Sequence, residues 1–433
     1  MEDFIYEFKY LFNFFRQNFL SLILICFYIL IFYDLSMQGT IYANDFLAFW
    51  STGRVAYSSG FNQIYNLETI KGIQTRTLID LMLLNPKDVS SFQVFPFPVL
   101  AVFIAPFALF KYFDLKTAFW IFTGANFLFC CGYLAYFSKQ IKILFPFVKQ
   151  IDDPLFLFIS VFPIFNCLLN GQIDLFLMVC VGEWIRNSLL DRPVLGGVWL
   201  TGLIIKPQTL ILIIPILIFL KQRKTLKGFF SASALIGLIS ALLCGITGMT
   251  DLLNIWKLYI TGMGSAYPSG MINWRMIALV LSEMCSSDLL GWSIGGLGAV
   301  LTCALVLKMN KHYTKSGAEE VPVFWLGVFS ATLALTWHSH YHMAAILIPL
   351  VMIVYQLKTL PAWIVKTWGL VTPTLWMIDG IANVIAKNYF GFPLSIDQGL
   401  MITFSGFILN LMILVVCVQK CSYIRNDPNF KKS

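Results

Sequence analysis

The chain has 433 residues, of which 58% are hydrophobic and only 12% are charged, and its mean hydropathy is +0.77. Soluble domains carry about 25% charged residues, so a water-soluble fold could not cover this much apolar surface. The composition therefore predicts an integral membrane protein. The net charge of +8 would suit a nucleic-acid ligand, but the Lys and Arg residues stand at the ends of apolar runs, where they act as topological anchors.

Thirteen apolar runs follow one another along the chain, and each crossing of a membrane needs about 20 apolar residues. The first run follows Lys9 and Arg16 and lacks a small-residue cleavage site before Tyr42, so we predict a mature helix with a cytoplasmic N-terminus. The runs are residues 19–37, 94–111, 115–137, 153–169, 173–190, 194–205, 208–220, 228–248, 288–308, 322–337, 342–357, 362–378 and 398–418.

If all thirteen runs crossed, three basic clusters would face outward, against the positive-inside bias. The run 94–111 contains three prolines and is barely long enough to span, so we predict that it re-enters or lies in the outer interface. All three clusters then become cytoplasmic, and the prediction is an all-α bundle of about twelve transmembrane helices with both termini inside. The clusters are Lys139/Lys142/Lys149, Arg186/Arg192 and Lys221/Arg223/Lys224/Lys227.

This topology makes residues 1–433 a single transmembrane domain with two long extracytoplasmic segments. Residues 38–114 form the first, which we expect to contain amphipathic juxtamembrane helices and the proline-containing segment. Residues 249–275 form the second. Nearly all unusual polar residues then collect on one face, and because polar groups at membrane depth are costly and tend to be functional, the sequence predicts a one-sided polar site.

Asp45 comes shortly after the first run. The apolar residues Phe46, Phe49, Trp50 and Val55 recur at helical spacing behind it, which suggests an amphipathic helix lying on the membrane surface. An acidic residue at the start of such a helix suits an N-cap as well as it suits catalysis, so this feature alone leaves both roles open. The aromatic side chains, Trp50 among them, would pack against flat rings or lipid tails.

A tight turn joins two apolar runs at Asn170, Gly171 and Gln172, and glycine is suited to such a turn. Asp174, at the start of the next helix, could again be only a cap. Taken by itself, this turn is typical of a purely structural element.

Two cationic residues stand near the predicted outer face. Lys206 precedes Pro207 between two short apolar runs. Its side chain could snorkel outward, or it could meet an anion beside the helix start at Pro207, and a phosphate is the sharper of these hypotheses. Asn273 and Arg275 come just before another apolar run and could likewise face a headgroup.

His338, His340 and His342 are three of only four histidines in the chain. A zinc site is conceivable from the residue types, but the alternating spacing suits a helix poorly, and no second cluster of ligands accompanies it. The ten cysteines show no CxxC spacing, so we interpret them as core residues and not as a disulfide framework or a metal site. Proton handling or hydrogen bonding to sugar hydroxyls is the favoured role of the histidines, and a simple interfacial loop is the alternative.

Several loose motifs, taken together and in this order, resemble glycosyltransferase family 87 of the membrane GT-C superfamily. The resemblance covers most of the chain up to about residue 350. Two features depart from the family pattern, because Phe-Pro-Phe-Pro stands where the family has Tyr-Pro-Pro and because the histidine run fits only approximately. The motifs are Asp45 with the following Phe-x-x-Phe-Trp-x-x-Gly-Arg, the Phe-Pro-Phe-Pro stretch, Asn170-Gly171-Gln172, Arg192-Pro193-Val194-Leu195-Gly196-Gly197, Lys206-Pro207 and the histidine run before Ile346–Pro349.

The resemblance implies a GT-C-type bundle and a metal-independent, inverting transfer of a monosaccharide, mannose or arabinose. The sugar would move from a polyprenyl-phosphate donor to a lipid or glycan acceptor on the extracytoplasmic face of a plasma membrane, in a bacterium by expectation. It implies that Asp45 is the general base. Lys206, Arg275 and Arg54 would then hold the donor phosphate. The residues expected to contact sugar or acceptor are Trp50, Asn170, Gln172, Asp174, Asn273, His338, His340 and His342.

Two other classes compete with an enzyme. A transporter of lipid-linked sugars commonly shows two similar halves with broken helices near the membrane centre, and no internal repeat is visible in this sequence. A non-catalytic lipid-binding subunit is the second alternative, and only turnover separates it from an active transferase.

Overall fold

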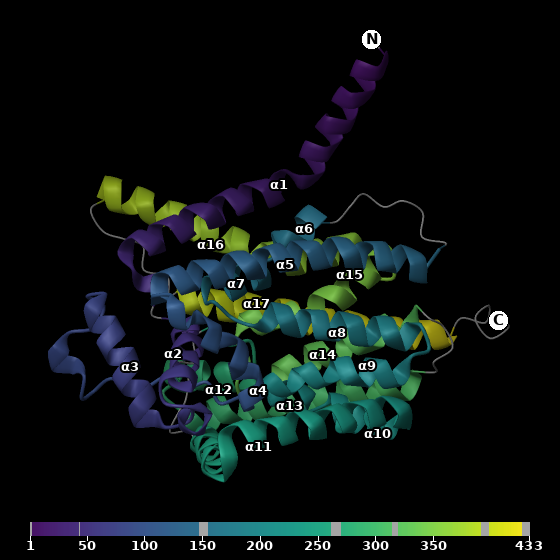
Figure 1. The fold of residues 1–433 in the computed structure, drawn as a ribbon. Helices are drawn as coiled ribbons and strands as arrows, with labels where there is room; N and C mark the ends of the chain where they lie inside the picture. Colours follow the sequence, from purple (N-terminus) through teal and green to yellow (C-terminus); the bar gives the residue numbers. More distant parts are fainter. Residues whose placement is uncertain are drawn as a thin grey trace.

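The computed structural model describes residues 2–42, 44–146, 155–260, 270–313, 319–390 and 398–426. Throughout these ranges the regular structure is helical, and the one β-type pairing is an isolated bridge between Met271 and His340. Most of the helices run side by side along a common direction (Figure 1). The predicted all-α class is confirmed.

Six helices in the described ranges are long and apolar enough to cross a bilayer. Large apolar side chains point outward from them, such as Ile246, which is 89% exposed. Apolar surface on this scale marks contact with lipid or with other apolar partners, so these helices form a bundle that belongs in a membrane. They are α1 (Glu2–Gln38), α5 (Leu115–Leu144), α11 (Arg223–Ile260), α13 (Asp288–His312), α16 (Ala362–Phe390) and α17 (Gln398–Asn426).

The remaining apolar runs fold as shorter helices, several of them interrupted or wound as 3₁₀ helix (η). Each has fewer than 18 residues, so helix length does not determine how many of them cross, and twelve crossings stays a prediction. They are α6 (Leu155–Ile159) with α7 (Phe162–Leu169), α8 (Asp174–Leu189), α9 (Pro193–Leu200) with η5 (Thr201–Ile205), η6 (Pro207–Leu210) with α10 (Ile213–Phe219), α14 (Glu320–Leu335), and η7 (Tyr341–Leu347) with α15 (Ile348–Gln356).

The segment between α1 and α5 is built from short helices, and its α2 differs from the expectation. Every residue of α2 from Phe46 to Ala56 except Arg54 is buried, so the apolar residues of this helix pack against protein and do not form an exposed apolar face. It packs so closely on η4 that a Cβ at Gly53 would come within 2.4 Å of the carbonyl oxygen of Phe107. The helices are η1 (Thr40–Tyr42), α2 (Asp45–Ser58), η2 (Phe61–Gln63), α3 (Leu67–Asp80), η3 (Pro86–Asp88), α4 (Ala101–Ile104) and η4 (Ala105–Tyr112).

Much of the expected second loop is helical. After a bend at Gly245, where φ is 66° and ψ is −176°, α11 continues through Met249 to Ile260. Residues 261–269 lie outside the described ranges, and α12 (Trp274–Met284) begins directly behind Asn273.

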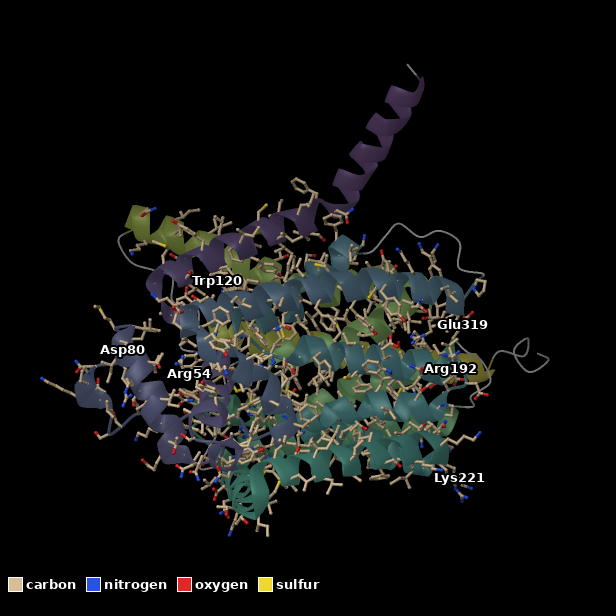
Figure 2. The ribbon with its side chains drawn as sticks, in the orientation of Figure 1. Arg54, Asp80, Trp120, Arg192, Lys221 and Glu319 are labelled. Carbon is tan, nitrogen blue, oxygen red and sulfur yellow. The ribbon has the colours of Figure 1, made fainter. Side chains whose placement is uncertain are left out.

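The charged residues that the topology assigns to opposite membrane faces lie at opposite ends of the bundle. Figure 2 shows Arg54 and Asp80 toward one end and Arg192 and Lys221 toward the other. Helix α17 also ends near the second group (Figure 1). Lys149 of the first basic cluster lies outside the described residues, and the assignment of one end to the cytoplasm stays a prediction from the positive-inside bias.

Candidate functional site

The turn between α7 and α8 is locked against the start of α2. Gly171 has a φ of +59°, a conformation that L side chains rarely adopt, and a Cβ there would come within 2.6 Å of Cβ of Phe46. Asn44, which caps α2 through the amide of Phe46, donates a second hydrogen bond of 2.8 Å to the carbonyl oxygen of Leu169. The two contacts bring Asp45 next to Gln172.

A continuous chain of polar contacts starts at this point. Gln172 donates from Nε2 to Oδ2 of Asp45, and its Oε1 accepts a hydrogen bond of 3.1 Å from Nζ of Lys206. The same Nζ lies 2.9 Å from each carboxylate oxygen of Asp174. Nδ1 of His342 contacts Oδ2 of Asp174 from the other side. We call these five residues, Asp45, Gln172, Lys206, Asp174 and His342, the polar cluster.

The residues of the polar cluster differ strongly in burial. Asp45 is exposed, and the side chain of Lys206 keeps 16% of its surface accessible. Asp174 has no exposed surface and His342 has 4%. A substrate can therefore meet Asp45 and Lys206, whereas Asp174, which we expected to contact substrate, is enclosed between Lys206 and His342 and can act only through them.

Irregular backbone gathers around the polar cluster. Lys206 stands between the 3₁₀ segments η5 and η6, and His342 lies within η7. Such segments expose backbone groups that a regular helix would pair, and at membrane depth they persist where they are buried in protein or line a cavity. Thr209 and Thr336 satisfy two of these groups, because their hydroxyls donate to the carbonyl oxygens of Lys206 and Gln208.

The histidine run is pinned to the segment before α12. Ile272 N donates to Ser339 O at 2.8 Å, and Tyr341 N donates to Gly270 O at 3.0 Å. The ring of His340 lies between those of His338 and His342, with centroid distances of 4.8 and 5.5 Å. His338 and His340 are therefore neighbours of the polar cluster, to which His342 belongs.

Burial and nearby cations keep His338 and His340 neutral. His338 and His340 lie in the turn between α14 and η7. Desolvation is the main cause that lowers the pKa of His338 to about 4, with further lowering by Lys206, His342 and Arg275 against a raising effect of Asp174. Desolvation and the neighbouring histidines hold the pKa of His340 well below its usual value. Neutral imidazoles can both donate and accept hydrogen bonds, as sugar hydroxyls require.

Arg275 and Asn273 lie on the α12 side of this pairing. The Arg275 guanidinium is stacked 4.4 Å from the ring centroid of Trp337, and burial lowers its pKa. Its Nε is buried, with no hydrogen-bond partner among the described residues. Asn273 caps α12 through Met276 N at 2.9 Å and is fully buried, so its side chain has a structural role in this state.

Three other expected residues do not join the polar cluster. Trp50 Nε1 and Arg54 Nη1 both donate to the carbonyl oxygen of Phe113, at 3.3 and 3.2 Å, and the guanidinium stacks on the indole. Asn170 donates to the carbonyl oxygen of Asn166 at 2.8 Å. In the described structure these side chains fasten α2 to the end of η4 and close the end of α7.

The sequence interpretation missed Asn44. Asn directly before an acidic first helical residue is a common N-cap pattern, and that signal could have assigned the cap to Asn44 instead of Asp45. Its second bond, to Leu169, had no signal in the sequence because the two residues are far apart along the chain.

The cysteines and histidines form no visible metal site in the described part of the chain. All ten cysteines are free, and no group of three or more His, Cys, Asp or Glu side chains in those ranges is arranged to hold a metal ion. The expectation of a metal-independent reaction stays a prediction.

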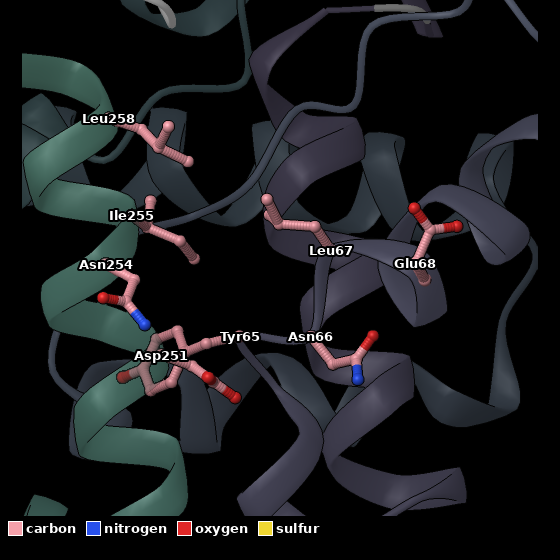
Figure 3. Close-up of a pocket in the computed structure, with 8 residues that line it drawn as sticks. All are labelled: Tyr65, Asn66, Leu67, Glu68, Asp251, Asn254, Ile255 and Leu258. Carbon is pink, nitrogen blue, oxygen red and sulfur yellow. The ribbon is translucent and has the colours of Figure 1, made fainter. Parts of the chain in front are cut away.

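A pocket of about 220 Å³ lies between the start of α3 and the last turns of α11. Figure 3 shows Asn66 and Leu67 on one side of it and Asn254 and Leu258 of α11 on the other. None of the residues that we predicted for the site lines this pocket. It is therefore a feature separate from the polar cluster.

Comparison with known proteins identifies the family. The sequence model of glycosyltransferase family 87 matches residues 97–338, which is more than half of the 433 residues. The matched range contains Gln172, Asp174, Lys206 and Arg275, and Asp45 lies outside it. Comparisons with curated proteins and with solved structures gave no match. The family match confirms the resemblance, and the chain belongs to glycosyltransferase family 87, a family of membrane glycosyltransferases.

Proposed function

We propose that this protein transfers a monosaccharide, mannose or arabinose, from a polyprenyl-phosphate donor to a lipid or glycan acceptor, with Asp45 as the general base. The observation that carries the proposal is the exposed Asp45 carboxylate, which a single amide separates from the Lys206 ammonium group. A base and an anion-binding group thus share one accessible site.

The chemistry of the donor explains why one carboxylate is enough. The acceptor hydroxyl oxygen attacks the anomeric carbon, the bond from that carbon to the phosphate oxygen breaks, and the hydroxyl proton passes to Asp45. The leaving phosphate is already stable as an anion, so it needs no general acid. Inverting glycosidases need a second carboxyl group, because their leaving oxygen must be protonated. A single displacement inverts the anomeric centre.

Lys206 would hold the donor phosphate. An ammonium group forms strong charge-assisted hydrogen bonds with phosphate oxygens. Asp174 stays behind Lys206 and aims it, because both of its oxygens lie 2.9 Å or less from their cationic or imidazole partners. The stacked Arg275, whose Nε has no partner among the described side chains, would supply a second contact to the phosphate.

The histidine run would contact the sugar or the acceptor. Its rings are held in fixed positions by the pairing with residues 270–272. No metal is required, because the leaving group is activated by Lys206 and Arg275. We place the site on the extracytoplasmic face, since Arg192 and Lys221 of the basic clusters lie at the opposite end of the bundle (Figure 2) and basic residues favour the cytoplasm.

The test is transfer by the purified chain in lipid, with a panel of radiolabelled polyprenyl-phosphate sugars and membrane lipid extract as the acceptor source. We expect Asp45→Asn to fold and insert but to lose transfer by roughly a hundredfold or more, in line with the loss of a positioned base. Asp80→Asn is the matched control, because Asp80 is an exposed carboxylate at the same end of the bundle as α2, which begins at Asp45.

Transfer by Asp45→Asn at the parent rate would refute the assignment of the base. Movement of labelled donor across the bilayer without a product would instead support a transporter. If the parent chain binds donor and turns over none of the panel, a non-catalytic subunit becomes the better account.

A further inference from the structure

We propose that Gln172 is a positioning residue that couples the phosphate site at Lys206 to the base Asp45, so that the base is ready only when donor is bound. This inference rests on the function proposed above and names how that site is regulated. It is carried by the placement of one amide between a carboxylate and an ammonium group.

The chemistry of its two partners fixes the orientation of this amide. An ionised carboxylate only accepts hydrogen bonds and an ammonium group only donates them. Gln172 must therefore turn Nε2 toward Asp45 and Oε1 toward Lys206, as the structure has it. A flipped amide would face both partners with the wrong group. The bridge therefore has one orientation, and each charged partner holds the amide in the orientation that the other partner requires.

The backbone of Gln172 is held as firmly as its side chain. Its N donates to the carbonyl oxygen of Cys167 at 2.8 Å. Its own carbonyl oxygen accepts from Asn126 and from the thiol of Cys167, both at 3.4 Å. With only 6% of Gln172 exposed, the amide cannot follow Asp45 if that carboxylate moves, so it defines where the carboxylate lies.

The bridge leaves one oxygen of Asp45 free for chemistry. Gln172 occupies Oδ2, so Oδ1 can take the proton of the acceptor hydroxyl. Oε1 of Gln172 shares the ammonium group of Lys206 with Asp174, and an anionic phosphate on Lys206 would compete for the same group. Phosphate binding would thus change the hydrogen bonds of the amide that holds Asp45. Donor binding would therefore precede productive binding of the acceptor.

Two substitutions separate this coupling from simple support of the fold. Gln172→Ala removes the bridge, and Gln172→Glu keeps its size but sets a second carboxyl group beside Asp45. We expect kcat to fall about tenfold to a hundredfold in both variants, as for a misplaced catalytic group. The affinity for sugar-free polyprenyl phosphate, measured on the purified full chain in lipid, should change by less than about threefold in Gln172→Ala.

The pH profile of kcat gives the decisive readout. Loss of a hydrogen bond to a carboxylate raises its pKa, and a neighbouring carboxylate raises it further. The acidic limb of the profile should therefore move to higher pH in Gln172→Ala and further in Gln172→Glu. A purely structural role would lower the amount of folded protein and leave the limb in place.

Gln38→Ala is the matched control. Gln38 donates from Nε2 to Asp34 Oδ2 at 2.8 Å, so it makes the same kind of bond to a carboxylate, but at the end of α1 and outside the polar cluster. Its kcat and its acidic limb should equal those of the parent.

The outcomes also separate this inference from the proposed function. If Asp45→Asn is inactive while both Gln172 variants keep the parent kcat and the parent limb, the coupling is refuted and the function stands. If Asp45→Asn transfers sugar at the parent rate, both fall. Should Gln172→Ala fail to insert, the isosteric Gln172→Glu decides the matter by the same readout.

Discussion

The side chain of Asn44 joins two segments that lie 125 residues apart, because its Nδ2 donates a 2.8 Å hydrogen bond to the carbonyl oxygen of Leu169 while its Oδ1 caps α2. Asp45 is the next residue after Asn44, and the turn with Gln172 begins directly after Leu169. One amide therefore sets the distance between the proposed base and its bridge.

Asn44→Ala should lower both stability and turnover. Loss of an N-cap costs about 1 kcal/mol, and the lost tie to Leu169 should loosen Asp45 and lower kcat by about tenfold, as a small misplacement does. Thermal unfolding and transfer assays measure the two effects. Asn66→Ala is the control, because Asn66 caps α3 in the same way. It should lose stability only, and an equal loss of kcat would contradict the role of the tie.

Gly171→Ala should disturb the same contact between α2 and the turn before α8, this time through a residue of the turn. The φ of +59° costs an L residue roughly 1–2 kcal/mol, and the added Cβ would meet Cβ of Phe46 at 2.6 Å. We expect a lower unfolding midpoint and reduced transfer. Gly237→Ala is the comparison, since nothing lies within 4 Å of a Cβ at that helical position. It should leave both measurements unchanged or raise stability slightly, and parity of the two variants would refute this reasoning.

Lys206→Ala should weaken donor binding more than it weakens the fold. The variant removes the one ammonium group of the polar cluster, and charge-assisted bonds to phosphate are among the stronger polar contacts. Binding of sugar-free polyprenyl phosphate is the measurement. Lys116→Ala serves as the control, since Lys116 is exposed near the ring of Tyr42 and outside the cluster. Unchanged donor affinity in Lys206→Ala would return Lys206 to a snorkelling role.

Asp174→Asn should weaken donor binding, although Asp174 is buried behind Lys206 and would not contact the donor itself. The substitution leaves the half-buried Lys206 without its counter-charge. Removing one partner of a buried ion pair costs about 3–5 kcal/mol of folding stability. Because Lys206 is partly exposed, we expect a loss of stability at about the lower end of that range. Glu183→Gln breaks the partly buried pair with Arg186 elsewhere in α8. It should lower stability but keep donor affinity, so a loss of affinity there would contradict a specific role of Asp174.

The stability of the protein should fall with acid because of His338. Its pKa is lowered to about 4 in the folded state, against about 6.5 when unfolded. Between these values the unfolded chain binds more protons, so stability decreases as pH falls from about 6.5 to 4 and is unaffected by this group above that window. Unfolding midpoints of the parent and His338→Gln, compared at pH 7 and near pH 4.5, should show a smaller acid loss in the variant. Equal losses would show that His338 is not the group responsible.

The sequence predicted the helical class because a long apolar chain must satisfy its backbone hydrogen bonds internally. The positive-inside bias also assigned residues 38–114 and the basic cluster with Lys221 to opposite faces, and Asp80 and Lys221 lie at opposite ends of the bundle. The sequence could not predict that α2 is enclosed. An apolar stripe followed by small residues has the same sequence pattern whether the helix faces lipid or packs against η4. The close approach of Gly53 to Phe107 depends on tertiary packing.

The sequence listed the members of the polar cluster as candidates but did not give the contacts between them. Residue type and position relative to the membrane brought Asp45, Gln172, Lys206 and His342 to one list of candidates. The pairing partners could not be read from them, because they come from four separate segments. Asp174 and Asn273 were expected at the substrate, yet both are buried, since a carboxylate or an amide looks the same in sequence whether it meets a ligand or a neighbouring side chain.

The short pairing of residues 270–272 with 339–341 has a consequence for how the chain tolerates change. Two backbone bonds, Ile272 N to Ser339 O and Tyr341 N to Gly270 O, fix its register. Successive residues of an extended segment face opposite ways, so deleting one residue between Gly270 and Asn273 would reverse which side chains face the histidines. The number of residues between Gly270 and Asn273 is therefore constrained, and a homologue with an insertion or deletion there would need a different pairing with residues 339–341.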